Sequence, residues 1–193
     1  MATSQAPKGM FVTCADSRIV PKVLMSVYPG DLFVVRSVGN LIPPVDAHGR
    51  STGDVYEASA VVYAVDALDV GEIVVCGHSN CGAMQAALAP GGPSDPNLAK
   101  WLSLTAPLRD RLSWSNMCDP VLTPHDQLSQ WNTLEQLEHL QTYPTVRRAV
   151  DRGTLTLHAM WFDFARARAL VFSPEAQRFV AAENVDLPAA SAA

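Results

Sequence analysis

The chain of 193 residues is long enough for one domain with a sizeable core, and its 48% hydrophobic and 17% charged content is typical of a compact globular protein. A net charge of −5 argues against nucleic acid or an anionic membrane as the main partner, and no apolar run approaches the ~20 residues that span a bilayer. The N-terminus lacks a secretory signal and four cysteines do not make a disulfide scaffold at this length, so we expect a reducing, cytoplasmic setting.

The first half of the chain alternates strand and helix patterns after a polar arm at residues 1–9. Short apolar runs rich in β-branched residues predict strands, and apolar residues at helical spacing, or a proline that can open a helix, predict helices. The predicted strands are residues 10–14, 32–36 and 72–76, and the predicted helices are residues 22–27 and 55–68. A loop punctuated by glycine and serine is expected from 38 to 53.

The second half continues this alternation. The predicted helices are a segment from Gly82 that stops at residues 90–93, residues 98–105 before Pro107, and residues 146–151 capped by Gly153. Another helix, after a surface connection at 113–125, carries a core-facing stripe of Leu128, Trp131, Leu134, Leu137 and Leu140. The pattern then predicts a strand over 154–164 and its partner over 169–172.

Alternating strands and helices indicate an α/β fold. We predict a mostly parallel central sheet flanked by helices on both faces, with a C-terminal antiparallel edge strand. We expect residues 1–193 to form a single domain, in which 1–9 is an arm and 186–193 a mobile tail.

Three potential metal ligands follow two of these strands. Cys14 ends the strand 10–14, and His78 and Cys81 come soon after the strand 72–76. Ligands bind at the carboxyl ends of the strands in a parallel sheet, so neighbouring strands would bring the two thiols and the imidazole together. Sulfur and imidazole are zinc ligands, and three protein ligands leave a fourth position for water. We therefore predict a catalytic zinc site, although a buried, inert thiol is the plainer interpretation of Cys14 by itself.

Asp16 and Arg18 lie two and four positions after Cys14. The aspartate can occupy the fourth zinc position, or it can accept a bidentate pair from the arginine and leave that position to water. An ordinary surface ion pair is the other interpretation. Side-chain alternation is expected to point Cys76 away from the partners of His78 and into the core, and Cys118 is expected to be an incidental thiol.

The segments around these residues resemble the β-class carbonic anhydrases. They read Cys-Ala-Asp-Ser-Arg at 14–18, Gly-Asp-Leu-Phe-Val-Val-Arg at 30–36 and Cys-Gly-His-Ser-Asn-Cys-Gly-Ala-Met at 76–84. Further similarity lies at 39–44, 63–65 and 132–144, so the resemblance spans about residues 5–180. The two metal motifs together are highly specific.

The resemblance implies that the protein hydrates carbon dioxide reversibly to bicarbonate and a proton by means of a zinc-bound hydroxide. It implies one zinc ion per chain, bound by Cys14, His78 and Cys81. It also implies a catalytic dyad of Asp16 and Arg18, in which Asp16 either helps to orient the hydroxide or replaces it as the fourth zinc ligand.

The resemblance further implies a substrate pocket that includes Gln5 and Phe33 and that lies at a subunit interface. A homodimer or a tetramer is therefore expected.

Two other functions stay open at this point. One is hydrolysis of a small molecule at a carbon–sulfur bond by a zinc hydroxide on the same fold, because the segment 46–57 departs from the family pattern near the pocket. The other is a zinc-stabilised interaction module that has lost activity through such departures. The Asp16/Arg18 pair favours carbon dioxide hydration over the first of these two functions.

Overall fold

The structure is a computed structural model that describes residues 4–111 and 121–184. In chain order its helices and strands are β1 (Gly9–Cys14), α1 (Pro21–Met25), β2 (Leu32–Ser37), α2 (Val55–Val62), β3 (Glu72–His78), α3 (Gly82–Leu88), α4 (Pro96–Leu102), α5 (Ala106–Arg111), α6 (Pro124–Thr142), α7 (Pro144–Asp151), β4 (Thr156–Asp163), β5 (Arg168–Ser173) and β6 (Arg178–Ala181). Cys118 and the predicted tail lie outside the described residues, as does most of the predicted connection at 113–125.

The strands form one six-stranded sheet in the order β2-β1-β3-β4-β5-β6. The first four strands are parallel, and β5 and β6 join antiparallel at one edge. This arrangement confirms the predicted fold class. The sheet ends in two antiparallel strands, β5 and β6, whereas the sequence indicated only the first of them.

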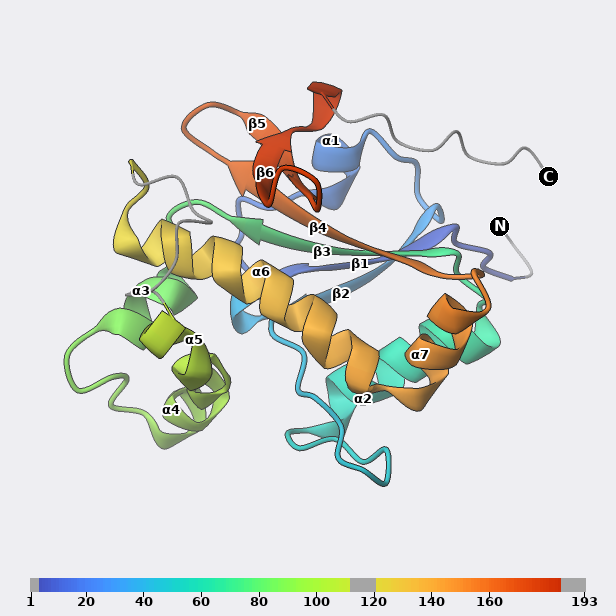
Figure 1. The fold of residues 1–193 in the computed structure, drawn as a ribbon, viewed down its shortest axis with the longest axis horizontal. Helices are drawn as coiled ribbons and strands as arrows, with labels where there is room; N and C mark the ends of the chain where they lie inside the picture. Colours follow the sequence, from blue (N-terminus) through green and yellow to red (C-terminus); the bar gives the residue numbers. More distant parts are fainter. Residues whose placement is uncertain (1–3, 112–120, 185–193) are drawn as a thin grey trace.

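Alternate side chains of the sheet point to its two faces. On β1, Met10 and Val12 pack with residues of α2, α6 and α7, whereas Phe11 lies in a separate cluster on the opposite face with Met25 of α1. Figure 1 shows α2, α6 and α7 on one side of the sheet and α1 on the other. Each fully buried large apolar side chain stabilises the fold by about 1.5–3 kcal/mol, so this two-sided core fixes the positions of the strand ends.

The side chains that α6 buries differ from the predicted stripe. Leu128 and Leu140 of the expected stripe are fully buried, but Trp131, Leu134 and Leu137 are only half-buried. The other buried side chains of α6 are polar: Ser129, Gln130, Asn132, Thr133 and Gln136. The helix therefore contacts the sheet and its neighbouring loop through hydrogen bonds as well as through apolar packing.

Several predicted helix boundaries differ from the structure, and two of these differences are at Pro107 and Pro124. Pro107 was expected to follow a helix, but it lies in the first turn of α5, after α4 and a 3₁₀ turn at Ser103–Thr105. Pro124 was expected in a connection, but it is the first residue of α6 and follows the N-cap Thr123. A proline lacks an N–H that the first helical turn does not use, so it fits the first turn of both helices without the loss of a hydrogen bond. No helix of the described chain combines the length and the apolar character needed to cross a membrane.

Candidate metal centre

The backbone brings the three predicted metal ligands to one edge of the sheet. Cys14 is the last residue of β1, His78 is the last residue of β3, and these two strands are parallel neighbours. Cys81 lies three residues after the end of β3 and is the N-cap of α3. Two strand ends and one helix start therefore converge, as the parallel sheet predicted.

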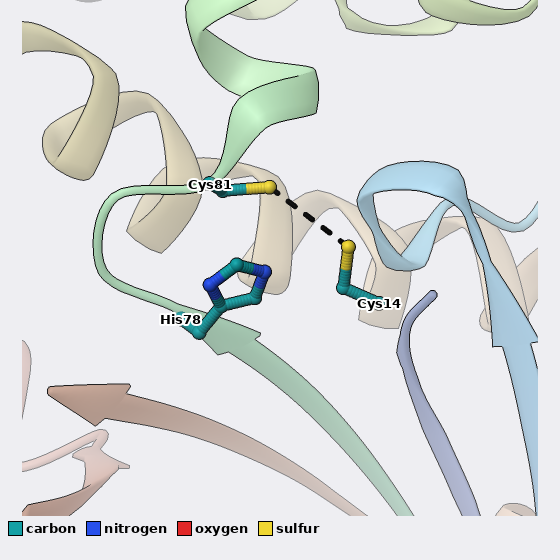
Figure 2. A group of neighbouring side chains, drawn as sticks. All are labelled: Cys14, His78 and Cys81. Atoms are coloured by element: carbon teal, nitrogen blue, oxygen red, sulfur yellow. Dashed lines mark hydrogen bonds between the residues drawn. The ribbon is translucent and has the colours of Figure 1, made fainter. Parts of the chain in front are cut away.

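The three side chains face one another (Figure 2). All are buried, and their ligand atoms lie within 4.8 Å of one another. The Sγ atoms of Cys14 and Cys81 are 4.0 Å apart. Two sulfurs at about 2.3 Å from one tetrahedral zinc ion would be about 3.8 Å apart, so the observed separation fits a shared zinc.

The imidazole of His78 is oriented for a ligand at its Nε2 atom. Nδ1 lies 2.9 Å from the carbonyl oxygen of Ser79, to which it donates, so Nε2 carries the lone pair. The side chain is fully buried, yet Nε2 has no hydrogen-bond partner among the described residues. Because an unsatisfied buried polar atom costs about 1–3 kcal/mol, this atom fits a metal ligand. The carbonyl oxygen of His78 also accepts a hydrogen bond of 2.8 Å from Ser129 on α6.

The two sulfurs differ in their electrostatics. The pKa of Cys14 is lowered to about 4, first by donation from the Cys81 thiol and then, against the effect of burial, by donation from the Gly39 N–H. The pKa of Cys81 is raised, first because it keeps the proton that the two sulfurs share and then by burial. The N–H groups of Met84 and Ala83 partly oppose that rise. These contacts favour the thiolate form of Cys14, and thiolate is the form that binds zinc.

Asp16 and Arg18 form a bidentate ion pair on the turn that follows β1. Arg18 donates from Nε to Asp16 Oδ1 over 2.9 Å and from Nη2 to Oδ2 over 2.7 Å. This donation lowers the pKa of Asp16 to about 2 and raises the pKa of Arg18. Asp16 Oδ2 also lies 3.9 Å from His78 Nε2. The pair therefore stands at the edge of the Cys14–His78–Cys81 cluster.

Sequence reasoning missed the residue that holds this turn in place. Arg36 on β2 donates to the carbonyl oxygens of Asp16 over 2.7 Å, of Ile19 over 3.1 Å and of Cys14 over 3.3 Å. The motif at 30–36 contains this arginine, but its partners are backbone carbonyls of another strand end. No residue pattern identifies such partners.

Helix α6 holds the loop behind Cys14. Asn132 donates to the carbonyl oxygen of Gly39 over 2.9 Å, and Gln136 accepts from the N–H of Ile42 over 2.7 Å. Gln136 also donates to Asn132 over 3.0 Å, and both side chains are completely buried. The N–H of Gly39 in turn donates to the Cys14 sulfur over 3.4 Å. Gly39 has a φ of +76° and packs closely on Ala83 and Met84, so glycine is required there.

Two other predicted site residues lie apart from this cluster in the single chain. Gln5 is exposed on the N-terminal arm. Phe33 is half-buried on β2, where its ring is 5.9 Å from that of Tyr63. Phe33 pairs with Met10 of β1. Met10 is four positions (14 − 10) before Cys14, so Phe33 is level with a point about 13 Å from Cys14 along the strand.

Cys76 is a core residue, as predicted. It is fully buried with Phe11 and Met160, and burial raises the pKa of its thiol to about 12. Side-chain alternation, however, does not point Cys76 away from the partners of His78, because residues 76 and 78 are two apart and lie on the same face of β3. Cys76 is separated from the metal cluster by its earlier position along the strand.

Known proteins are similar to this chain in both fold and sequence. A family model described as carbonic anhydrase matches residues 9–169, which include Cys14, Asp16, His78 and Cys81. The solved structure described as the beta-carbonic anhydrase CcaA has a TM-score of 0.82 and 33% sequence identity, and the match covers 93% of this chain and 86% of that one. The chain belongs to the β-carbonic anhydrase family.

Other members are similar over most of their length. A carbonic anhydrase of Pseudomonas aeruginosa is 40% identical over 182 residues, which are 93% of this chain and 80% of the relative. A β-carbonic anhydrase structure from Sordaria macrospora, described as tetrameric, has a TM-score of 0.76 at 29% identity and covers 89% of this chain and 83% of its own. Two thiols and an imidazole in this geometry are a zinc-ligand set, and zinc is the cofactor of this β-carbonic anhydrase chain.

Proposed function

We propose that the protein catalyses the reversible hydration of carbon dioxide to bicarbonate and a proton. The observation that carries the proposal is the convergence of Cys14, His78 and Cys81 with an aspartate–arginine pair 3.9 Å from His78 Nε2. Membership of the β-carbonic anhydrase family supports the same reaction.

In this proposal Cys14, His78 and Cys81 bind one zinc ion. When bound, zinc lowers the pKa of water so that hydroxide is available near neutral pH to attack an electrophilic carbon. The chain's own contribution begins with Nδ1 of His78, which stays fixed on Ser79 and presents Nε2 to the metal. Gly39 donates to the Cys14 sulfur and stabilises its thiolate.

The role that we propose for Asp16 is to accept a hydrogen bond from the reacting water at Oδ2. Both carboxylate oxygens already accept from Arg18, which fixes the plane of the carboxylate. With its pKa near 2, Asp16 stays ionised and can act only as an acceptor at neutral pH. Each oxygen accepts one hydrogen bond from the Arg18 guanidinium, and Oδ2 keeps a second lone pair for the water. We therefore propose Asp16 as a partner of Arg18 and of the water rather than as the fourth zinc ligand.

We further propose that the site is completed in a homodimer or a tetramer. Gln5 is exposed and Phe33 is on the edge strand β2, so both are available to a second copy. Exposed apolar side chains on and beside that edge, Val34, Val38 and Tyr63, favour an interface there. We propose a reducing, cytoplasmic compartment as the setting, because Cys14 and Cys81 must stay unoxidised to bind zinc.

A comparison of substrates tests the proposed reaction. Protein of measured zinc content is assayed for carbon dioxide hydration by stopped flow and, separately, for hydrolysis of carbon disulfide. We expect turnover of carbon dioxide, and loss of this turnover with retained zinc in Asp16→Asn. The matched control is Asp69→Asn, an exposed aspartate at φ +50° that asparagine tolerates, which should keep full turnover.

Each of the other outcomes rejects the proposal in a different way. Turnover of carbon disulfide alone would identify a hydrolase acting on carbon–sulfur bonds. Full zinc without turnover of either substrate, in an assembled oligomer, would identify a zinc-stabilised interaction module.

A further inference from the structure

An aromatic side chain outside the predicted site contacts two of its residues. Phe164 directly follows β4, at the start of the turn to β5. The centroid of its ring lies 4.3 Å from Cζ of Arg18. The same ring meets the His78 imidazole edge-on, with centroids 5.4 Å apart and planes at 68°. Phe164 therefore touches both the dyad arginine and a predicted zinc ligand.

The backbone and a neighbouring ring hold Phe164 in this position. Its N–H donates to Ser79 Oγ over 2.9 Å, and the N–H of Ser79 donates to the carbonyl oxygen of Phe162 over 2.9 Å. The Phe162 ring packs edge-on against the Phe164 ring at 5.3 Å. Asp163 accepts from the N–H of Ala165 over 2.9 Å and thereby fixes the following turn. The position of the ring is thus coupled to the segment that carries His78.

Other carboxylates lie near Arg18, so a contact that limits rotation of its side chain favours the pair with Asp16. Its side chain is 44% exposed. A cavity of about 430 Å³ is lined by Arg18 and Phe164 together with Asp126 and Asp163. A guanidinium uses its edge for hydrogen bonds and its flat faces for stacking. A ring stacked on one face leaves the Nε–Nη2 edge for Asp16, while Nη2 also donates to the carbonyl oxygen of Asn80 over 3.2 Å. The ring also limits rotation of the side chain toward the cavity.

We propose that Phe164 is a positioning residue for the hydration reaction. It stacks on Arg18 so that the guanidinium holds both oxygens of Asp16, and it supports the ring of His78 from the side. The inference rests on the proposed function, because it assigns Phe164 a role through the Asp16/Arg18 dyad. Phe164 acts on turnover and not on substrate binding, so its loss should lower kcat and leave KM for carbon dioxide unchanged.

The experiment compares stopped-flow hydration by Phe164→Leu, Phe164→Met and Phe164→Tyr in zinc-loaded protein. Leucine and methionine keep apolar volume without a π face, and tyrosine keeps the ring. We expect kcat to fall roughly 3- to 30-fold in the leucine and methionine variants, with zinc content and KM unchanged, and to stay within about twofold of wild type with tyrosine. Phe172→Leu is the matched control, because Phe172 also packs edge-on against another ring, Phe179, on β5 and β6. It should keep wild-type kcat.

A double variant tests whether Phe164 acts through Arg18. If it does, Phe164→Leu should lower kcat in the wild-type background and cause no further fall in an Arg18→Ala background. The inference is overturned if the leucine and methionine variants keep wild-type kcat, if the tyrosine variant falls as far as they do, or if zinc is lost in step with turnover. Failure of the proposed function can be distinguished from failure of the Phe164 inference. In that case the wild type would not hydrate carbon dioxide, or Asp16→Asn would remain fully active.

Discussion

Substitution of Gly77 by alanine should disturb the metal centre through packing alone. Gly77 lies in β3 directly before His78 and against α6. A Cβ atom added there would overlap Thr133 Oγ1 and would lie 3.1 Å from Trp161 Cδ1 and 3.2 Å from the carbonyl oxygen of Ser129. Two of these three neighbours are in α6, and Ser129 also donates to the carbonyl oxygen of His78. Relief of the overlap therefore has to break the hydrogen bond from Thr133 to the carbonyl oxygen of Ser129, or to move β3 and α6 apart at the zinc ligand.

Overpacking of this kind costs about 1–3 kcal/mol. For a chain of this size each kcal/mol lowers Tm by about 2–4 °C, so Gly77→Ala should lower Tm by about 2–12 °C. Because the strain reaches the backbone of His78, the variant should also bind zinc more weakly. Thermal unfolding followed by circular dichroism measures the first effect, and competition with a chromogenic chelator measures the second.

The matched control is Gly71→Ala, just before the same strand. A Cβ atom at Gly71 has nothing within 4 Å, so its Tm should change by no more than about 2 °C. Adding Thr133→Ala to Gly77→Ala removes the overlapped atom and should restore part of the lost Tm. The packing argument is refuted if Gly77→Ala and Gly71→Ala have the same Tm and zinc affinity as wild type.

Three further predictions concern the metal and the charges around it. Cys81→Ser should lose both zinc and stability. Its metal content should be near zero, and its Tm should be lower than that of wild type even after zinc is added. Stoichiometric zinc in this variant would exclude Cys81 as a ligand. Hydration activity should rise as pH increases above about 7, because the zinc-acidified water titrates in that range whereas Asp16, with a pKa near 2, is already ionised. A flat rate from neutral to alkaline pH would contradict this. The folded-state pKa of Asp16 is below its ordinary value of 3.8, so its contribution to stability is present above about pH 4 and is lost toward pH 2. The difference in urea stability between wild type and Asp16→Asn should therefore narrow as pH falls through this range, and a difference that widens would argue against the ion pair.

The strands and most helices could be predicted because their signals are local. Apolar runs and helical spacing gave β1 to β5 and α6 to within a few residues, and the order of elements implied a parallel sheet. The convergence of Cys14, His78 and Cys81 followed from that topology, since each side chain lies at or just after the end of a neighbouring strand. These predictions needed only sequence periodicity and the rule that strand ends meet at one edge.

The support of the site could not be predicted because it depends on contacts across long sequence distances. The buried amides of Asn132 and Gln136 hold a loop more than ninety residues earlier, and in the sequence they look like the polar side of an amphipathic helix. Phe164 has no periodic pattern that would place its ring over Arg18, 146 positions (164 − 18) before it. Polar residues buried by a specific partner, and aromatic residues in turns, become visible only when the fold is known.

The most direct test of zinc-dependent carbon dioxide hydration is a zinc titration of the activity. Protein freed of metal with a chelator receives zinc in steps, and the stopped-flow rate of carbon dioxide hydration is recorded against zinc bound per chain. We predict that the rate rises in proportion to bound zinc and reaches its maximum at one zinc per chain, and that Asp16→Asn binds the same amount of zinc without the rise. A rate that is independent of bound zinc, or a fully metal-loaded protein that does not hydrate carbon dioxide, would contradict the account.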